Sequence, residues 1–370
     1  MLYKRIVAKL GTNLLTGGSG CLNFDIMSNL VSQIAQLHQT GHELVIVSSG
    51  AVAAGRKKLP HARERKDIPF KQMLASVGQS QLMNIYEHLM NRYDITIAQA
   101  LLTRSDLSHR AGYLNTRNTL LALIELGVIC IVNENDVVAT EEIGGARFGD
   151  NDNLSAMVAN LIDADLLILL TDIDGLYSAD PHHNPNARII PKVEKFDSRI
   201  QRLASKNAGI LGVGGMATKI EAAKMATSCG MAVVISSGYK SDALIQIAQG
   251  ENLGTLFTPS THKLESKKRW MLSGLSSKGK LSIDDGAVTA LKKQNKSLLP
   301  AGITSLEGKF RRGDVVDILG NKGNLIGRGI SNYTSKDINI IKGTHSKQVS
   351  EILGYEYGSE IVHRNNMVLI

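Results

Sequence analysis

Short apolar runs alternate with amphipathic segments from the start of the chain to about residue 260. Helical spacing of the apolar positions predicts helices over residues 25–38, 114–126, 154–162 and 218–227. The runs between them are typical of strands buried on both faces, and they read KRIVAKL, ELVIVSSG, ITIAQALLT, VICIVNEND, LLILLTD and MAVVISSG. Strand and helix repeated in this order predict an α/β fold with a parallel, doubly wound sheet and right-handed crossovers.

The pattern changes after about residue 260. THKLESKKRWMLSG is polar and basic, and Gly-rich turns then separate short alternating segments. A β-hairpin is predicted where NKGN joins DVVDILG and LIGRGIS. A short helix is predicted over residues 284–294. The last 25 residues are expected to form a helical piece and a final strand that returns to this domain. We therefore expect a first domain over residues 1–262, a linker over 263–277 and a small β-rich domain over 278–370.

Small or polar residues close all six predicted strands. They are Lys9 with Gly11, Ser48 to Gly50, Thr103, Asn133 to Asp136, Thr171 with Asp172, and Ser236 to Gly238. In open α/β sheets, ligands bind outside the carboxyl ends of the strands. The sequence therefore predicts that these segments meet at one crevice.

The segment FGDNDN is the most polar stretch between two apolar strands. Asp150, Asn151, Asp152 and Asn153 directly precede an apolar helical pattern, so Asp152 or Asn153 would serve as an ordinary N-cap. A cap needs one such residue, whereas this segment has four in a row. We therefore favour a functional site over a cap alone.

Two Gly-rich turns that carry a Lys indicate phosphate binding. KLGTN contains Lys9 and Gly11, and GVGGMATK contains Lys219 one turn into a helix. A third turn, SSGAVAAG, has small residues that let backbone approach a ligand closely. Each turn alone is also compatible with a surface Lys or a tight strand-to-helix connection, and neither a Walker A nor a GxGxxG motif is present.

Composition narrows the choice of function classes. The apolar fraction of 43% in 370 residues is ordinary for a protein with a sizeable core, and no apolar run approaches the roughly 20 residues that a membrane span needs. The N-terminus has no secretory pattern, so we expect a cytoplasmic protein without a membrane partner. The three Cys residues are not spaced as metal ligands, and we interpret His182 and His183 as solvated rather than metal-binding. The sequence shows no recognisable Ser–His–Asp catalytic triad. The net charge of +8 fits an anionic substrate, a nucleic acid or a solvated surface.

Taken together, these motifs resemble the glutamate 5-kinase family of the amino acid kinase superfamily, with a PUA-like domain at the C-terminus. KLGT, SSGAVAAG, NENDVVAT, FGDNDNLSA, LLTDIDGLYSADP and GVGGMATK occur in the order of the family. The resemblance implies a three-layer sandwich around a mostly parallel sheet, followed by a small β-rich barrel. It also implies ATP-dependent phosphorylation of the L-glutamate side chain as the first step of L-proline biosynthesis, with Mg²⁺ carried by ATP and no protein metal site.

The resemblance also assigns roles to residues. As catalytic residues it implies Lys9, Lys219 and Asp152. On the glutamate side it implies Ser49, Gly50, Ala51, Asn133, Asp136, Asp150 and Asn151. On the ATP side it implies Lys9, Gly11, Thr171, Asp172, Tyr177, Val213, Gly214, Gly215, Met216, Ala217, Thr218 and Lys219.

Family analogy further implies feedback inhibition by L-proline, a homo-oligomer (dimer or tetramer) and handover of the acyl phosphate to a glutamyl phosphate reductase. Two alternatives stay open. One is a kinase of the same fold for N-acetylglutamate, carbamate or UMP. The other is RNA binding through the basic PUA-like domain, against which a solvated regulatory or oligomer-supporting module is favoured.

Overall fold

The computed structural model describes residues 1–61, 65, 67–139, 151–181, 183–198, 200, 203, 215–259 and 277–370. The chain divides into two compact units, one made of Met1–Leu107 with Arg117–His262 and the other of Ser108–Thr116 with Lys263–Ile370. The predicted linker over 263–277 lies outside the described residues except for Ser277. The predicted domain boundaries therefore stay a prediction.

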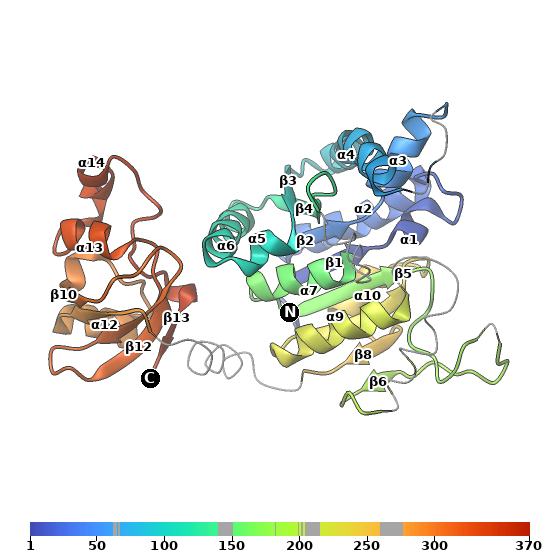
Figure 1. Cartoon of the computed structure of the whole chain (residues 1–370). Helices are drawn as coiled ribbons and strands as arrows, with labels where there is room; N and C mark the ends of the chain where they lie inside the picture. The colour runs from blue at the N-terminus through green and yellow to red at the C-terminus, as the bar shows by residue number, and fades with distance from the viewer. Residues whose placement is uncertain are drawn as a thin grey trace. The chain divides into compact units, whose positions relative to one another are not determined.

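The first unit is built on an eight-stranded sheet in the order β3-β4-β2-β1-β5-β7-β8-β6 (Figure 1). Six of its strands are mutually parallel neighbours and coincide with the six predicted apolar runs: β1 (Arg5–Leu10), β2 (Glu43–Ser48), β3 (Ile97–Leu102), β4 (Ile129–Glu134), β5 (Leu166–Thr171) and β7 (Ala232–Ser237). The short strands β6 (Lys192–Val193) and β8 (Thr255–Phe257) complete one edge, where β8 pairs antiparallel with β7. The predicted α/β class and mostly parallel sheet are confirmed.

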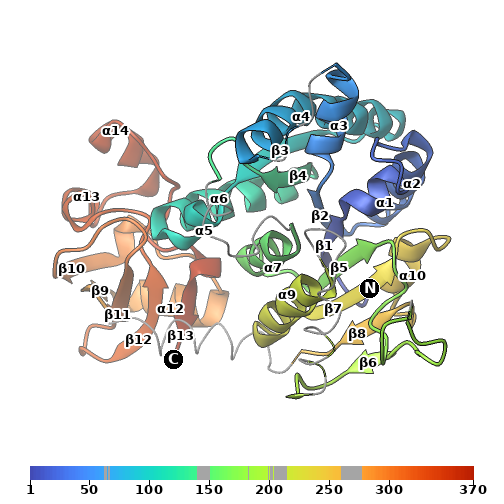
Figure 2. The ribbon, with the colours of Figure 1, turned by 45° about the vertical axis from the view of Figure 1, so that its right-hand side comes forward.

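Helices cover both faces of this sheet (Figure 2). One face carries α1 (Thr12–Thr16), α2 (Phe24–Gln39), α4 (Ile68–Met90) and α10 (Ala243–Gln249), and α3 (Ala51–Lys58) packs on α4. The other carries α7 (Asn151–Leu161), α9 (Met216–Ser228) and the part of α6 (Arg110–Glu125) that belongs to this unit, from Arg117 onward. The unit thus has the predicted three layers. The predicted helices are confirmed as α2, α6, α7 and α9, although α6 and α7 begin earlier than the apolar periodicity indicates.

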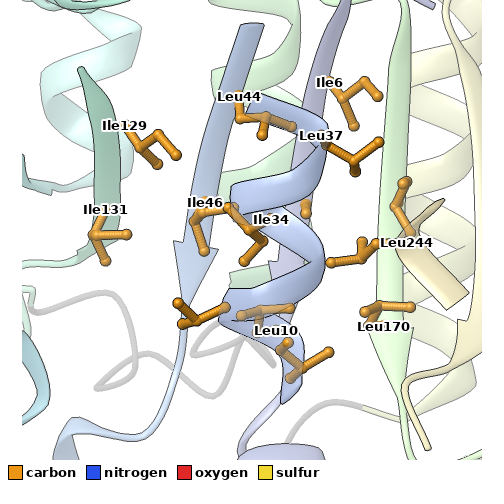
Figure 3. Close-up of a cluster of buried hydrophobic side chains, with 14 of the residues drawn as sticks. Ile6, Leu10, Ile34, Leu37, Leu44, Ile46, Ile129, Ile131, Leu170 and Leu244 are labelled. Atoms are coloured by element: carbon orange, nitrogen blue, oxygen red, sulfur yellow. The ribbon is translucent and has the colours of Figure 1, made fainter. Parts of the chain in front are cut away.

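The core between the sheet and α2 explains which way each strand residue points. Alternate strand positions such as Ile6, Leu10 and Ile46 pack against Ile34 and Leu244 from the helices (Figure 3). Because side chains alternate across a strand, Lys9 points from β1 to the opposite face, where α7 and α9 lie. The sheet's alternation therefore sets the direction of this lysine.

The carboxyl ends of the six parallel strands share one edge of the sheet. β1 and β2 run in register from Arg5 opposite Glu43 to Leu10 opposite Ser48, and β5 and β7 end together at Thr171 and Ser237. The polar residues that close the strands consequently gather at this edge, as predicted.

The second unit contains a five-stranded sheet in the order β10-β9-β11-β12-β13. The predicted hairpin is present as β11 (Val315–Leu319) and β12 (Leu325–Ile330), and the chain end returns as β13 (Met367–Leu369) beside β12. The predicted helix is α12 (Asp285–Gln294), capped by Asp284, whose Oδ1 accepts from the Ala287 amide at 2.6 Å. The remaining elements are β9 (Gly279–Ile283), β10 (Ile303–Glu307), α13 (Ser335–Ile341) and α14 (Val349–Leu353).

The sequence analysis missed the longest helix, α4. Asp67 caps it, its Oδ1 accepting from the Phe70 amide at 2.9 Å, and Pro69 lies in its first turn. Its buried residues do not form one apolar stripe, because α3 packs on it closely while other residues face α2 and the sheet. In the part of the chain that the structure describes, no helix is long and apolar enough to cross a membrane.

Candidate active site at the carboxyl edge of the sheet

Two lysines and one aspartate form a buried ion cluster at this edge. Lys9 Nζ lies 2.6 Å from Asp152 Oδ1, and Lys219 Nζ lies 3.2 Å from Asp152 Oδ2. The side chain of Asp152 is fully buried, and those of Lys9 and Lys219 are 4% and 6% exposed. Two ammonium groups held on one carboxylate, where water screens charge poorly, suit an anionic ligand.

Three separate elements bring these charges together. Lys9 is on the central strand β1, Asp152 is in the first turn of α7, and Lys219 is one turn into α9. Thr218 also contributes, since its hydroxyl lies 2.9 Å from Asp152 Oδ2 and 2.8 Å from the Gly215 carbonyl oxygen. Asp152 is therefore held by β1 and α9 and lies inside α7, which favours the site over the alternative of a helix N-cap at this residue.

Asn153 does not cap α7 either. It lies inside the first turn, and its buried Oδ1 accepts no hydrogen bond from the described residues. Asp150, the remaining cap candidate, lies outside the described residues. Asn151, Asp152 and Asn153 are thus buried inside the first turn of α7 and do not occupy its N-cap position.

A chain of amide groups leads from α7 toward β2 and β4. Asn151 Nδ2 donates to Ser49 Oγ and to Asn133 Oδ1, both at 2.9 Å, and approaches the Ser48 carbonyl oxygen at 3.3 Å. Asn133 Nδ2 in turn donates to Gln79 Oε1 at 2.9 Å. The structure therefore joins three residues of the predicted glutamate side, Ser49, Asn133 and Asn151, in one hydrogen-bonded set.

Gly50 and Ala51 begin α3 directly beside Ser49. Gly50 has a φ of 108°, a conformation that favours glycine, and it occupies the N-cap position before Ala51. The first amides of α3 have no partner inside the helix, so this turn supplies backbone N–H donors for a carboxylate. Asp136, half-buried in the turn after β4, completes the described part of the predicted glutamate side.

Asp172 directly follows the end of β5. Its carboxylate accepts from Thr171 Oγ1 at 2.8 Å and from Asn13 Nδ2 at 3.1 Å. Burial alone would raise the pKa of Asp172, but these hydrogen bonds and the charge of Lys219 outweigh it and hold the pKa below its usual value. Asp172 is thus an anion that lies in the field of Lys219, which links the two predicted nucleotide-side segments.

Gly11 and the start of α9 flank the ion cluster. A Cβ on Gly11 would lie 3.6 Å from Lys9 Nζ and 3.4 Å from the Leu170 carbonyl oxygen. Gly215 precedes α9, and Met216, Ala217 and Thr218 form its first turn. A largely buried helix start that carries Lys219 fits phosphate oxygens.

Three further residues of the predicted ATP side are Tyr177, Val213 and Gly214. The Tyr177 hydroxyl donates to Asp174 at 3.4 Å, and burial and Asp174 raise the pKa of its phenol. Val213 and Gly214 lie outside the described residues. Among the described residues, no group of three or more His, Cys, Asp or Glu side chains is arranged to hold a metal ion.

Sequence reasoning missed the supporting residues contributed by α4. Tyr86 is buried there, and its hydroxyl lies 2.7 Å from Ser48 Oγ; Gln79 bonds Asn133 as described above. Asp67 and Pro69 were the available signals for the start of this helix. Without that element, neither residue had a place in the predicted site.

A mostly parallel sheet between two layers of helices, with a buried Lys–Asp–Lys cluster at the carboxyl ends of its strands, suits a phosphotransferase. The chain belongs to the amino acid kinase family, whose model matches residues 4–237, and residues 279–353 match the PUA domain. It is similar to proteins named glutamate 5-kinase from several bacteria. The one from Dehalococcoides mccartyi (strain ATCC BAA-2266 / KCTC 15142 / 195) is 56% identical, covering 100% of this chain and 99% of that protein.

Two further relatives carry the same name. The glutamate 5-kinase of Herpetosiphon aurantiacus is 48% identical over 99% of this chain and 98% of that protein. That of Shewanella amazonensis is 46% identical over 100% of this chain and 96% of that protein. A solved UMP kinase from Bacillus anthracis aligns with 70% of this chain and 98% of that chain, with 15% identity and a TM-score of 0.48.

Proposed function

We propose that this chain transfers the γ-phosphoryl group of ATP to the side-chain carboxylate of L-glutamate, giving L-glutamyl 5-phosphate and ADP, the first step of L-proline biosynthesis. The observation that carries the proposal is the buried cluster of Lys9, Asp152 and Lys219, in a chain 56% identical along its length to a protein named glutamate 5-kinase. Two lysines around one carboxylate fit phosphate groups, and the amide set beside them fits a small polar acceptor.

The acceptor needs no general base. A side-chain carboxylate with a pKa near 4.3 is already ionised at neutral pH. One of its oxygens forms the new bond to the γ-phosphorus while the bond from that phosphorus to the β–γ bridging oxygen breaks, and the electron pair of the broken bond leaves with ADP. The protein therefore works by positioning the two anions and offsetting their mutual repulsion.

In this proposal, Lys9 and Lys219 contact the transferred phosphoryl group from two sides, and Asp152 keeps the two ammonium groups apart and directed. Gly11, Thr171, Asp172, Tyr177 and residues 213–218 border the nucleotide. Mg²⁺ enters with ATP on its phosphates, in keeping with the preference of this ion for phosphate oxygens, a few carboxylates and water.

On the acceptor side, Ser49, Gly50 and Ala51 donate to a glutamate carboxylate. Asn133, Asp136 and Asp150 surround its ammonium group, and Asn151 reaches both parts. An acetylated amine carries no charge and would lose its attraction to the carboxylates of Asp136 and Asp150, so free glutamate is preferred over N-acetylglutamate.

The proposal extends to the whole chain in four respects. Residues 1–262 carry the transfer, and residues 278–370 form a regulatory or oligomer-supporting PUA-like domain. L-Proline inhibits by competing for the glutamate site. The protein works as a homo-oligomer. The product, an acyl phosphate that hydrolyses readily, passes to a reductase.

ADP release with a panel of acceptors tests the proposal. We expect release with L-glutamate and little with N-acetylglutamate, aspartate, carbamate or UMP. EDTA should abolish it and excess Mg²⁺ should restore it. Faster turnover of any other acceptor than of glutamate would refute the substrate assignment.

A further inference from the structure

Helix α4 borders each described segment of the acceptor side. Tyr86 hydroxyl meets Ser48 Oγ at 2.7 Å, Gln79 Oε1 accepts from Asn133 at 2.9 Å, and Gln72 Nε2 lies 3.3 Å from the Ala139 carbonyl oxygen. One rigid element thus supports the ends of both β2 and β4. A side chain of α4 that reaches this edge is therefore well placed to touch the acceptor.

Two polar atoms beside Asn133 are buried and lack hydrogen-bond partners among the described residues. One is a donor, Gln79 Nε2, and the other is an acceptor, Asn151 Oδ1. In each of these side-chain amides, the second polar atom is hydrogen-bonded to Asn133. The two unpaired atoms, Gln79 Nε2 and Asn151 Oδ1, therefore lie on either side of Asn133. Leaving a buried donor and a buried acceptor unpaired is costly, and such a pair is expected where a ligand supplies the missing partners.

The α-carbon of an amino acid carries the complementary groups. Its carboxylate accepts hydrogen bonds, and its ammonium group donates them. We propose that Gln79 determines acceptor specificity: its Nε2 donates to the α-carboxylate of glutamate while Asn151 Oδ1 accepts from the ammonium group. This inference rests on the proposed function and adds a recognition residue that the sequence motifs do not contain.

The sheet supplies the right spacing for this arrangement. Asn133 is on β4 and Lys9 is on β1, with β2 between them. Neighbouring strands lie about 4.8 Å apart, so two strand intervals separate Asn133 and Lys9 by roughly 10 Å along the sheet. The register places their side chains on opposite faces, so a ligand that joins them passes over the strand ends. A five-carbon amino acid with a hydrogen bond at each end spans such a gap, with its α-carbon at Gln79 and its side-chain carboxylate at the lysines.

The test compares three acceptors that differ only at the α-carbon. Glutamate has both groups, glutarate keeps the corresponding carboxylate but has no ammonium, and 4-aminobutanoate keeps the ammonium but has no α-carboxylate. Gln79→Met preserves side-chain length and removes the donor. Gln81→Met makes the same change two residues further along α4, where the side chain lies beside Leu22 and Lys58, and serves as the matched control.

We expect Gln79→Met to lower kcat/KM at least about tenfold for glutamate and glutarate, mainly through KM, and to leave 4-aminobutanoate within about twofold. For an acceptor that is phosphorylated too slowly to measure, its inhibition constant in competition with glutamate is compared instead of kcat/KM. Equal losses for all three compounds would show that Gln79 only supports Asn133, and unchanged values for all three would show that it does not contact the acceptor; either result overturns the inference. A wild-type protein that does not phosphorylate glutamate refutes the proposed function itself, whereas the other results leave it intact.

Discussion

At the scale of single residues, Asp152 is the position on which the site depends. Its carboxylate contacts both buried lysines and the Thr218 hydroxyl. Sequence spacing cannot bring residues 9, 152 and 219 together, because their proximity depends on strand order. The convergence of strand ends predicted the shared edge, whereas the particular triad came from family resemblance.

Asp152→Asn keeps the size of this side chain and removes its charge. Lys9 and Lys219 then lose the negative charge that they share and repel each other more strongly, so we expect kcat to fall by about 10²–10³-fold with a small change in the glutamate KM. Steady-state kinetics give both values, and circular dichroism checks the fold. Asp25→Asn, the same change in the first turn of α2, is the control. Near-normal turnover in Asp152→Asn would remove this residue from the phosphoryl-transfer site.

Glu43 provides a pH test of stability far from the reacting groups. Its carboxylate lies 3.0 Å from Lys4 Nζ and 2.6 Å from Arg5 Nη2. Burial alone would raise the pKa of Glu43, but hydrogen bonds from Lys4 and Arg5, together with their charges, outweigh it and hold the pKa below the usual 4.5. A lowered folded-state pKa stabilises the protein above pH 4.5, and that stabilisation is lost as the pH falls through the folded-state value.

We therefore expect Glu43→Gln to reduce the free energy of unfolding at pH 7, with the difference from wild type shrinking below about pH 4.5. Urea titrations at several pH values measure this difference. Glu87→Gln, an exposed carboxylate on α4, should show no such trend. A deficit in Glu43→Gln that persists unchanged at low pH would mean that the ion pairs are not its cause.

At the scale of elements, buried parallel strands were predictable and α4 was not. A strand covered by helices on both faces has an uninterrupted apolar run, which the sequence displays directly. Helix α4 packs on two sides, so its apolar residues form no single stripe, and Gly78 weakens the helical signal further. Because this helix was not predicted, the α4 residues that support the acceptor side, Gln79 and Tyr86, were not predicted either.

Gly78 tests how closely α3 and α4 must pack. A Cβ there would lie 1.8 Å from the Ala51 carbonyl oxygen and 2.3 Å from the Gly55 amide nitrogen, both backbone atoms. An ordinary Gly→Ala change inside a helix stabilises by about 1 kcal/mol, but this one should destabilise by about 1–3 kcal/mol because α3 has to move.

The movement of α3 should also raise the glutamate KM, because Ala51 begins that helix next to Ser49. Thermal unfolding and steady-state kinetics measure the two effects. Ser80→Ala, at an exposed position of the same helix, is the control. A stabilised Gly78→Ala protein would contradict the close packing of the two helices.

At the scale of the whole molecule, the two sequence patterns, before and after about residue 260, correspond to two sheets of different kinds. The alternation of strand and helix predicted the eight-stranded, mostly parallel sheet, and the Gly-rich turns after residue 277 predicted a small β-rich unit. Pairing order could not be read from the sequence, because β9 lies between β10 and β11 through contacts distant along the chain. The net charge of +8 agrees with anionic substrates but does not select among them.

The central claim is that the chain makes an acyl phosphate from glutamate and ATP. Hydroxylamine converts such a product to a stable hydroxamate, so trapping it while measuring ADP release tests the claim most directly. We predict one hydroxamate per ADP, dependent on glutamate, ATP and Mg²⁺, and reduced in Asp152→Asn in proportion to kcat. ADP release without glutamate-dependent hydroxamate would contradict the claim.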